Sequence, residues 1–218
     1  MSRRSTEEMI AALAAEARPV KPLAPPLSRA LLLLASLGLL FAGLIAFAGD
    51  VAGMLARYAG DEAMMAAETG GMLITGVLAI CGAFALSVPG GSRAWLLVPL
   101  PSLLLWVLLS GAGCYRGLMR HGLDGWGSAG HPDCLIFILG ASLAVGIPVL
   151  WLLSRARPIE PTPVATLGGL GVAALAAFLL QFFHPFAITM IDLAFHALAV
   201  LIVIASAALL RRLVLRPA

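Results

Sequence analysis

The sequence predicts an all-α membrane protein: a six-helix transmembrane bundle preceded by a short amphipathic helix on a proline-rich stalk. The 218 residues are 61% hydrophobic and 11% charged, and the mean hydropathy is +1.02, which excludes a soluble domain with a polar surface. A bilayer core about 30 Å thick requires about 20 apolar residues per helix, and six stretches meet or approach that length. The Lys and Arg residues also gather in alternate connections, as membrane topology demands.

The six predicted spans follow one another through short connections. They are Ala30 to Gly49, Gly70 to Val88, Ala94 to Ser110, Cys134 to Leu153, Val164 to Phe183, and Phe186 to Leu210. The third span contains Pro99 and Pro101, so we expect a kink or a change of tilt there. In the fifth, Gly169, Ala173 and Ala177 recur at four-residue spacing, which should allow close helix packing. The chain thus divides into residues 1–29, a membrane domain at 30–210, and a basic tail at 211–218.

Positive charge predicts the orientation, because the insertion machinery retains Lys and Arg on the cytoplasmic side. Eleven of the 14 Lys and Arg residues lie in the two termini and in the second and fourth loops. Arg57, Arg116 and Arg120 lie on the other side. We therefore expect both termini in the cytoplasm. The same distribution explains a pI near 9.1 without direct binding of nucleic acid.

A cleavable signal peptide is the rival interpretation of the first span. The stretch "AFA" at 46–48 resembles a cleavage site. However, a signal peptide has a short basic leader and an apolar core of about 7 to 15 residues. Here 29 residues containing three Glu precede a longer apolar run, which favours a retained anchor.

The segment before the first span has the pattern of a short soluble helix. Ser5 and Glu8 have the spacing of a capping box, which starts a helix, and Pro19 should end it. One face carries the apolar residues Met9, Ile10, Leu13, Ala14 and Ala17. Four prolines follow, at Pro19, Pro22, Pro25 and Pro26. They favour an extended polyproline-type stalk about 25 Å long.

Such a short helix is marginal alone in water, so its apolar face requires the membrane surface, the bundle or another protein. Residues 6–18 contain three Glu and one Arg, whereas helices that lie on anionic lipid have a basic polar face. The more specific hypothesis is that the apolar face binds in a groove on a cytosolic protein. A solvated tail without function is the alternative.

Ionisable residues within predicted spans are functional candidates, because their burial is costly. Asp192 and His196 lie four residues apart on the sixth span and share a face. They could form a hydrogen-bonded pair, a proton-responsive unit or half of a metal site, and we favour a structural polar contact. Nothing nearby completes a metal ligand set. Glu68 can lie at the membrane interface, so we give it little weight as a functional candidate.

The third loop holds most of the thiol and imidazole groups. Cys114 and Cys134 bracket it on the predicted periplasmic side, while Cys81 lies about 16 Å into the second span. The other titratable groups of this region are His121, His131, Asp133 and, on the next outward turn, His184. Thiolate and imidazole suit the sensing of oxidants or thiophilic metals. A structural disulfide or two idle thiols are equally compatible with the spacing.

No enzyme motif occurs in the sequence. We find no nucleophile elbow, phosphate-binding loop, paired-carboxylate site or HExxH motif, and the spacing of the cysteines matches no defined zinc signature. We therefore expect no catalysis, no cofactor and no resident metal.

Three stretches resemble the NrsF family of membrane anti-sigma factors: "MIAALAAEARPVKPLAPPLSRALLLL", "CLIFILGASLAVGIPVLWLLSRARP" and, more loosely, "FFHPFAITMIDLAFHALAVLIVIASAALLRRLVL". The resemblance implies a protein that holds a cytosolic extracytoplasmic-function sigma factor at the bacterial inner membrane. It also implies release of that sigma factor when a periplasmic cysteine pair meets an oxidant or a heavy metal.

Cys134 corresponds to the first cysteine of the family's pair. The place of the second reads Phe183, His184, Pro185 and contains no cysteine. Three alternatives remain: Cys114 is the partner of Cys134, His184 is the second ligand, or the protein responds to another signal. A different class of function, a small six-span transporter or membrane redox protein using Asp192, His196 and the cysteines, is the runner-up.

Overall fold

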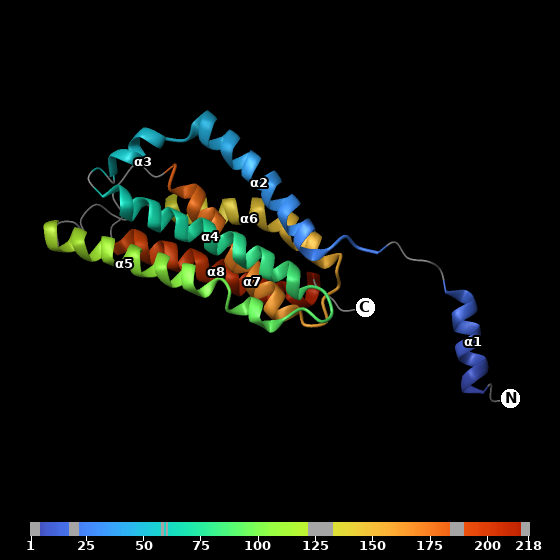
Figure 1. Ribbon diagram of the computed structural model, residues 1–218. Coiled ribbons are helices and arrows are strands. Elements are labelled where there is room, and N and C mark those ends of the chain that lie inside the picture. The colour runs from blue at the N-terminus through green and yellow to red at the C-terminus, as the bar shows by residue number, and fades with distance from the viewer. Residues whose placement is uncertain are drawn as a thin grey trace.

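The computed structural model describes residues 5–17, 22–57, 59, 61–121, 133–183 and 190–214. Within these ranges the chain is all helical, as predicted. The elements are α1 (Thr6–Glu16), α2 (Pro26–Ala48), α3 (Val51–Arg57), α4 (Glu62–Leu86), the 3-10 helix η1 (Arg93–Leu96), α5 (Leu100–His121), α6 (Asp133–Ser154), α7 (Pro161–Leu180) and α8 (Met190–Val214). Figure 1 shows a bundle of long helices with α1 standing apart from it.

Six helical stretches are long and apolar enough to cross a membrane, which confirms the predicted six-helix architecture. Their ends differ from the predicted ones. Helix α2 begins at Pro26, not Ala30, because the ring of proline fixes a helical φ and its missing N–H would be unpaired in the first turn anyway. Pro26 therefore belongs to the helix and not to the stalk.

The third span is broken, in agreement with the distortion expected near Pro99 and Pro101. Helix η1 ends at Leu96, a turn follows, and α5 starts at Leu100. Helix α5 then continues to His121, well beyond the predicted Ser110. Part of the predicted third loop is therefore helical.

Helix α3, which follows α2 almost directly, was not predicted. Asp50 precedes it, and the Gly53 N–H donates to Asp50 Oδ1 at 2.8 Å, so a side chain satisfies a donor of the first turn. The Asp50 N–H donates to the Phe182 carbonyl at 2.7 Å. The second bond joins the connection between α2 and α3 to the turn that follows α7.

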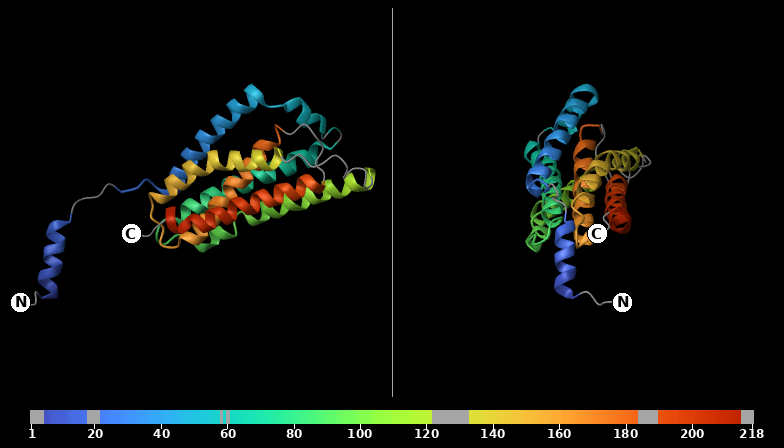
Figure 2. Two further views of the ribbon diagram at one scale, coloured as in Figure 1. Left: turned by 180° about the vertical axis from the view of Figure 1, so that it is seen from behind. Right: turned by 90° about the vertical axis from the view of Figure 1, so that its right-hand side faces the viewer.

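Helix α7 forms the centre of the bundle and packs against α4, α6 and α8 (Figure 2). Most of its residues are buried, including Ala173 and Ala177. A Cβ atom on Gly169 would lie 3.0 Å from Ala207 Cβ. The small residues of the fifth span thus allow the close helix packing that their spacing predicts.

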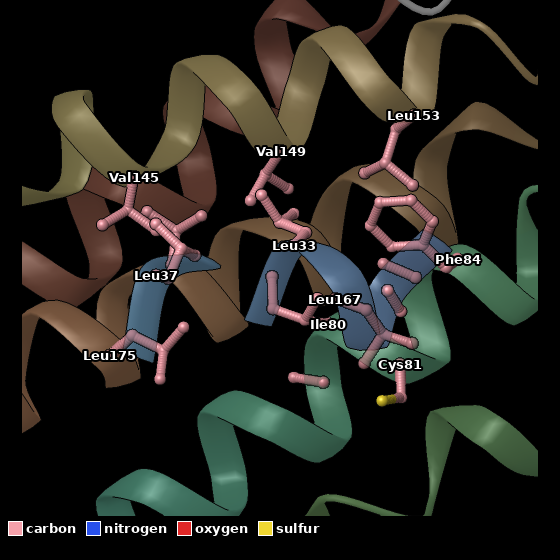
Figure 3. Close-up of a cluster of buried hydrophobic side chains, with 14 of the residues drawn as sticks. Leu33, Leu37, Ile80, Cys81, Phe84, Val145, Val149, Leu153, Leu167 and Leu175 are labelled. Atoms are coloured by element: carbon pink, nitrogen blue, oxygen red, sulfur yellow. The ribbon is translucent and has the colours of Figure 1, made fainter. Parts of the chain in front are cut away.

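Helix α2 covers α4 and α6 with a stripe of leucines (Figure 3). Leu33 and Leu37 belong to a cluster that contains Phe84 of α4 and Val149 of α6. Cys81 lies in the same cluster with 7% of its surface exposed. Its burial in the second span agrees with the sequence prediction.

The contact between α4 and α7 provides a test of this packing. A Cβ atom on Gly171 would lie 2.8 Å from Ile80 Cδ1 and 3.0 Å from the backbone nitrogen of Ile80. We expect Gly171→Ala to destabilise the purified protein by about 1–3 kcal/mol, the usual effect of overpacking, in equilibrium unfolding in detergent. The matched control is Gly38→Ala, because a Cβ there meets no atom within 4 Å. Equal stability of the two variants would contradict the packing described.

Candidate functional site: the N-terminal helix and its attachment to the bundle

Helix α1 starts with the capping box that the sequence predicts. The Glu8 N–H donates to Ser5 Oγ at 3.2 Å, and the Ser5 N–H donates to Glu8 Oε2 at 2.9 Å. Two backbone donors that the helix itself leaves unpaired are satisfied in this way. The helix ends at Glu16, and Ala17 has an extended backbone.

The apolar face of α1 is exposed. Met9, Ile10 and Leu13 expose 53%, 61% and 63% of their surfaces, and α1 contains no buried residue. Ala14 and Ala17 are exposed as well. A helix of 11 residues has little stability alone in water. The apolar face therefore has the composition of a contact surface. Among the described residues, no element covers it.

Arg29, in the first turn of α2, attaches the base of the stalk to the bundle. Its Nη2 donates to the carbonyl of Leu152, which lies in the last turn of α6, where a helix leaves carbonyls unpaired and favours a cation. The guanidinium carbon lies 5.2 Å from the ring centroid of Phe84, within the range of a cation–π contact. A single side chain thus joins α2, α4 and α6. The sequence had indicated only that Arg29 is one of the positive charges that predict the orientation in the membrane.

An ion pair joins the start of η1 to the residue that precedes α7. Arg93 Nη2 and Glu160 Oε1 are 2.7 Å apart, with 77% and 55% of the side chains exposed. Because water screens such pairs, this bridge contributes little to stability. It is a useful comparison for Arg29, which is half-buried.

Glu68, to which we gave little weight as a functional candidate, is buried inside the bundle. Only 2% of its surface is exposed, and Ser110 Oγ donates to Glu68 Oε1 at 2.6 Å. Two turns away, Thr75 Oγ1 donates to Ser102 Oγ at 2.9 Å. Helices α4 and α5 are therefore joined by polar contacts inside the bundle.

The sequence did contain a signal for this contact. Ser102 and Ser110 lie on one face of α5 at a spacing of eight residues, and Trp106 lies between them. Glu68 and Thr75 are spaced by seven residues on α4. Matching polar stripes on successive spans indicate a polar interface between them.

Helix α8 carries both members of the predicted intramembrane polar pair in its first turns. The His196 side chain is half-buried, whereas the side chain of Asp192 lies outside the described residues. Their predicted contact therefore stays a prediction.

The predicted sensing residues are spread over separate elements. Cys134 lies in the first turn of α6, and Cys114 lies on α5, four residues after Ser110, not in a loop. The side chains of both cysteines lie outside the described residues, as does His184. Helices α5 and α6 are not among the closely packed pairs. Among the described residues, no group of three or more His, Cys, Asp or Glu could hold a metal ion.

The described residues thus form an all-α bundle in which six helices are long and apolar enough to span a membrane, with a capped helix whose apolar face is exposed. A comparison with protein families matches residues 13–216 to the NrsF family, described as negative regulator of sigma F. The chain belongs to this family, which confirms the resemblance seen in the sequence. No curated protein and no solved structure matches the chain.

The contacts of Arg29 can be tested through stability. Arg29→Gln removes a charge-assisted hydrogen bond and a cation–π contact, so we expect a loss of about 2 kcal/mol in the free energy of unfolding in detergent. The matched control is Arg93→Gln, for which about 0.5 kcal/mol or less is expected. If the two variants unfold at the same denaturant concentration, Arg29 does not hold the helices together.

Proposed function

We propose that the protein is a membrane-anchored anti-sigma factor whose helix α1 binds an extracytoplasmic-function sigma factor. The observation that carries this proposal is the exposed apolar face of α1 on a chain of the NrsF family. A short amphipathic helix that lies in an apolar groove is a recurrent mode of recognition. Bound there, α1 would occlude a surface that the sigma factor uses elsewhere.

The charge of α1 favours a protein partner over lipid or nucleic acid. Its first turn contains Glu7 and Glu8, and its last turn contains no basic residue. Anionic lipid surfaces and phosphate backbones attract basic faces. The large side chains of Met9, Ile10 and Leu13 would supply most of the binding energy, as buried anchors do at protein interfaces.

The proposed location is the bacterial inner membrane, with both termini in the cytoplasm. The distribution of Lys and Arg supports this orientation. It puts α1 in the same compartment as a sigma factor, and it puts the start of α6, with Cys134, on the periplasmic side. Signal and partner are then on opposite faces of the membrane.

Helix α6 is the proposed connection between the two faces. It runs from Asp133 to Ser154 with Pro148 inside it, and the helical rise puts Cys134 about 27 Å from Leu152 along its axis. The Leu152 carbonyl accepts from Arg29, at the base of the stalk. A shift of α6 caused by chemistry at Cys134 would change or break this bond. The two states would then differ in how the stalk is held, which is the differential contact that a switch requires.

The proposed signal is an oxidant or a thiophilic metal that reacts at Cys134. Cys114 as the second thiol and His184 as the second ligand remain alternative partners. Both alternatives use the affinity of thiolate and imidazole for such agents.

The contact with the sigma factor is tested by Leu13→Asp. A charge in the centre of the apolar face should weaken binding of the sigma factor at least tenfold, measured by co-purification and by transcription from a sigma-dependent promoter. The matched control is Ala15→Asp on the opposite face of α1, which should bind normally. Deletion of residues 1–27 should abolish repression while membrane insertion persists. If Leu13→Asp co-purifies with the sigma factor as well as the wild-type protein does, the proposal is wrong.

The sensing step is tested by thiol labelling of membranes before and after treatment with oxidant. If Cys114 and Cys134 form a regulatory disulfide, both should lose their reactivity together, and the buried Cys81 should be unchanged. Loss of reactivity at Cys134 alone would favour His184 as the second group. Full labelling of both cysteines under each condition would exclude a regulatory disulfide.

A further inference from the structure

A small groove of about 170 Å³ lies between two connections at one end of the bundle. One wall is the connection between α4 and η1, and the other is the connection between α6 and α7, so that Val88, Gly91, Ile159 and Pro163 are among the lining residues. Ile159 exposes 71% of its surface. Figure 1 shows these connections at the same end of the bundle as the start of α2 and as α1. The groove is therefore open at the end of the molecule that carries α1.

The groove and the apolar face of α1 match in size and in what they lack. A cavity of about 150 Å³ holds a molecule as large as benzene, so the groove has room for about one side chain of the size of leucine or methionine. Met9, Ile10 and Leu13 each expose more than half of their surfaces. No described element covers either these side chains or Ile159.

The stalk is long enough to bring α1 to the groove. Arg29, in the first turn of α2, lies over the ring of Phe84, and Leu86, two residues further along α4, already lines the groove. The nine residues 17–25 can extend to about 28 Å, at about 3.1 Å per residue. A short link of this kind gives an effective concentration on the order of millimolar, so even a weak contact between α1 and the groove is populated.

Helix α1 and the rim of the groove carry opposite charges. Residues 5–17 contain no basic residue, and their acidic residues are Glu7, Glu8 and Glu16. The two connections carry Arg93, Arg155 and Arg157 against the single carboxylate of Glu160. Although Arg93 is paired with Glu160, its side chain is 77% exposed. The excess of positive charge at this end attracts an acidic helix and disfavours a basic one.

We propose that α1 binds the end of its own bundle when it has no other partner, with Leu13 in the groove against Ile159 and the glutamates of α1 facing the arginines. The arrangement in Figure 1, with α1 apart from the bundle, is then the form that is open to a partner. The contact itself requires no sigma factor.

The consequence for regulation rests on the proposed function. The docked form covers the same apolar face that is proposed to bind the sigma factor, so the bundle and the sigma factor compete for α1. The connection that carries Ile159 directly follows α6. A change in α6 that strengthens the groove would therefore release the sigma factor, because the two contacts of α1 exclude each other.

The contact is tested by disulfide trapping in the full chain, with the native cysteines replaced by alanine, at high dilution in vesicles of phosphatidylethanolamine and phosphatidylglycerol. Leu13→Cys with Ile159→Cys should form an intramolecular disulfide at least about fivefold faster than Ala15→Cys with Ile159→Cys. Ala15 is the matched control because it lies on the opposite face of the same tethered helix. High salt should slow trapping of the first pair, since it screens the opposite charges. Equal rates for the two pairs would overturn the inference.

A second measurement keeps the native cysteines and follows binding of a purified extracytoplasmic-function sigma factor that co-purifies with the chain. Ile159→Asp removes the apolar wall and repels α1, so it should tighten this binding about two- to fivefold, because no docked α1 has to be displaced. Ile159→Val, which keeps the wall, should bind as the wild-type chain does.

Unchanged or weaker binding by Ile159→Asp would contradict the competition, and weaker binding would assign the groove to the sigma factor itself. If the wild-type chain binds no sigma factor, the proposed function fails. Disulfide trapping, which uses no sigma factor, still decides whether α1 contacts the groove.

Discussion

The close approach of α7 to its neighbours is the constraint on which the bundle depends. In a membrane, helices gain little from the hydrophobic effect because lipid is as apolar as leucine, so packing contacts must hold them together. Gly171 against Ile80, and Gly169 against Ala207, bring backbones near enough for many small dispersion contacts to add up. The other helices are then arranged around α7 (Figure 2), and α2 is added across α4 and α6 through its leucines (Figure 3).

Polar groups inside this apolar setting join particular helices. Ser110 donates to Glu68 between α5 and α4, and Arg29 donates to Leu152 between α2 and α6. Since an unpaired polar group in the interior is expensive, each such contact specifies which helices must be neighbours. Packing at α7 thus holds the helices together, and the buried polar contacts determine which helices are neighbours.

The sequence predicted the six spans and the capped helix because both are local patterns. Hydropathy over about 20 residues and the Ser5–Glu8 spacing need no knowledge of neighbours. Helix neighbours are a different matter, because the contact of Glu68 with Ser110 joins residues 42 positions apart. Arg29 carried a topology signal, but its contact with Leu152 joins residues 123 positions apart. Helix α3 is short and starts from a side-chain bond of Asp50, which a search for long apolar stretches does not detect.

The separation of α1 from the bundle bears on how such proteins can diverge. No residue of α1 is buried, so substitutions on its apolar face leave the packing around α7 unaffected. A duplicated copy of the chain could therefore acquire a new partner by changes in a few exposed side chains while the membrane domain stays under its own selection. Recognition and anchoring can then evolve as two nearly independent traits within one polypeptide.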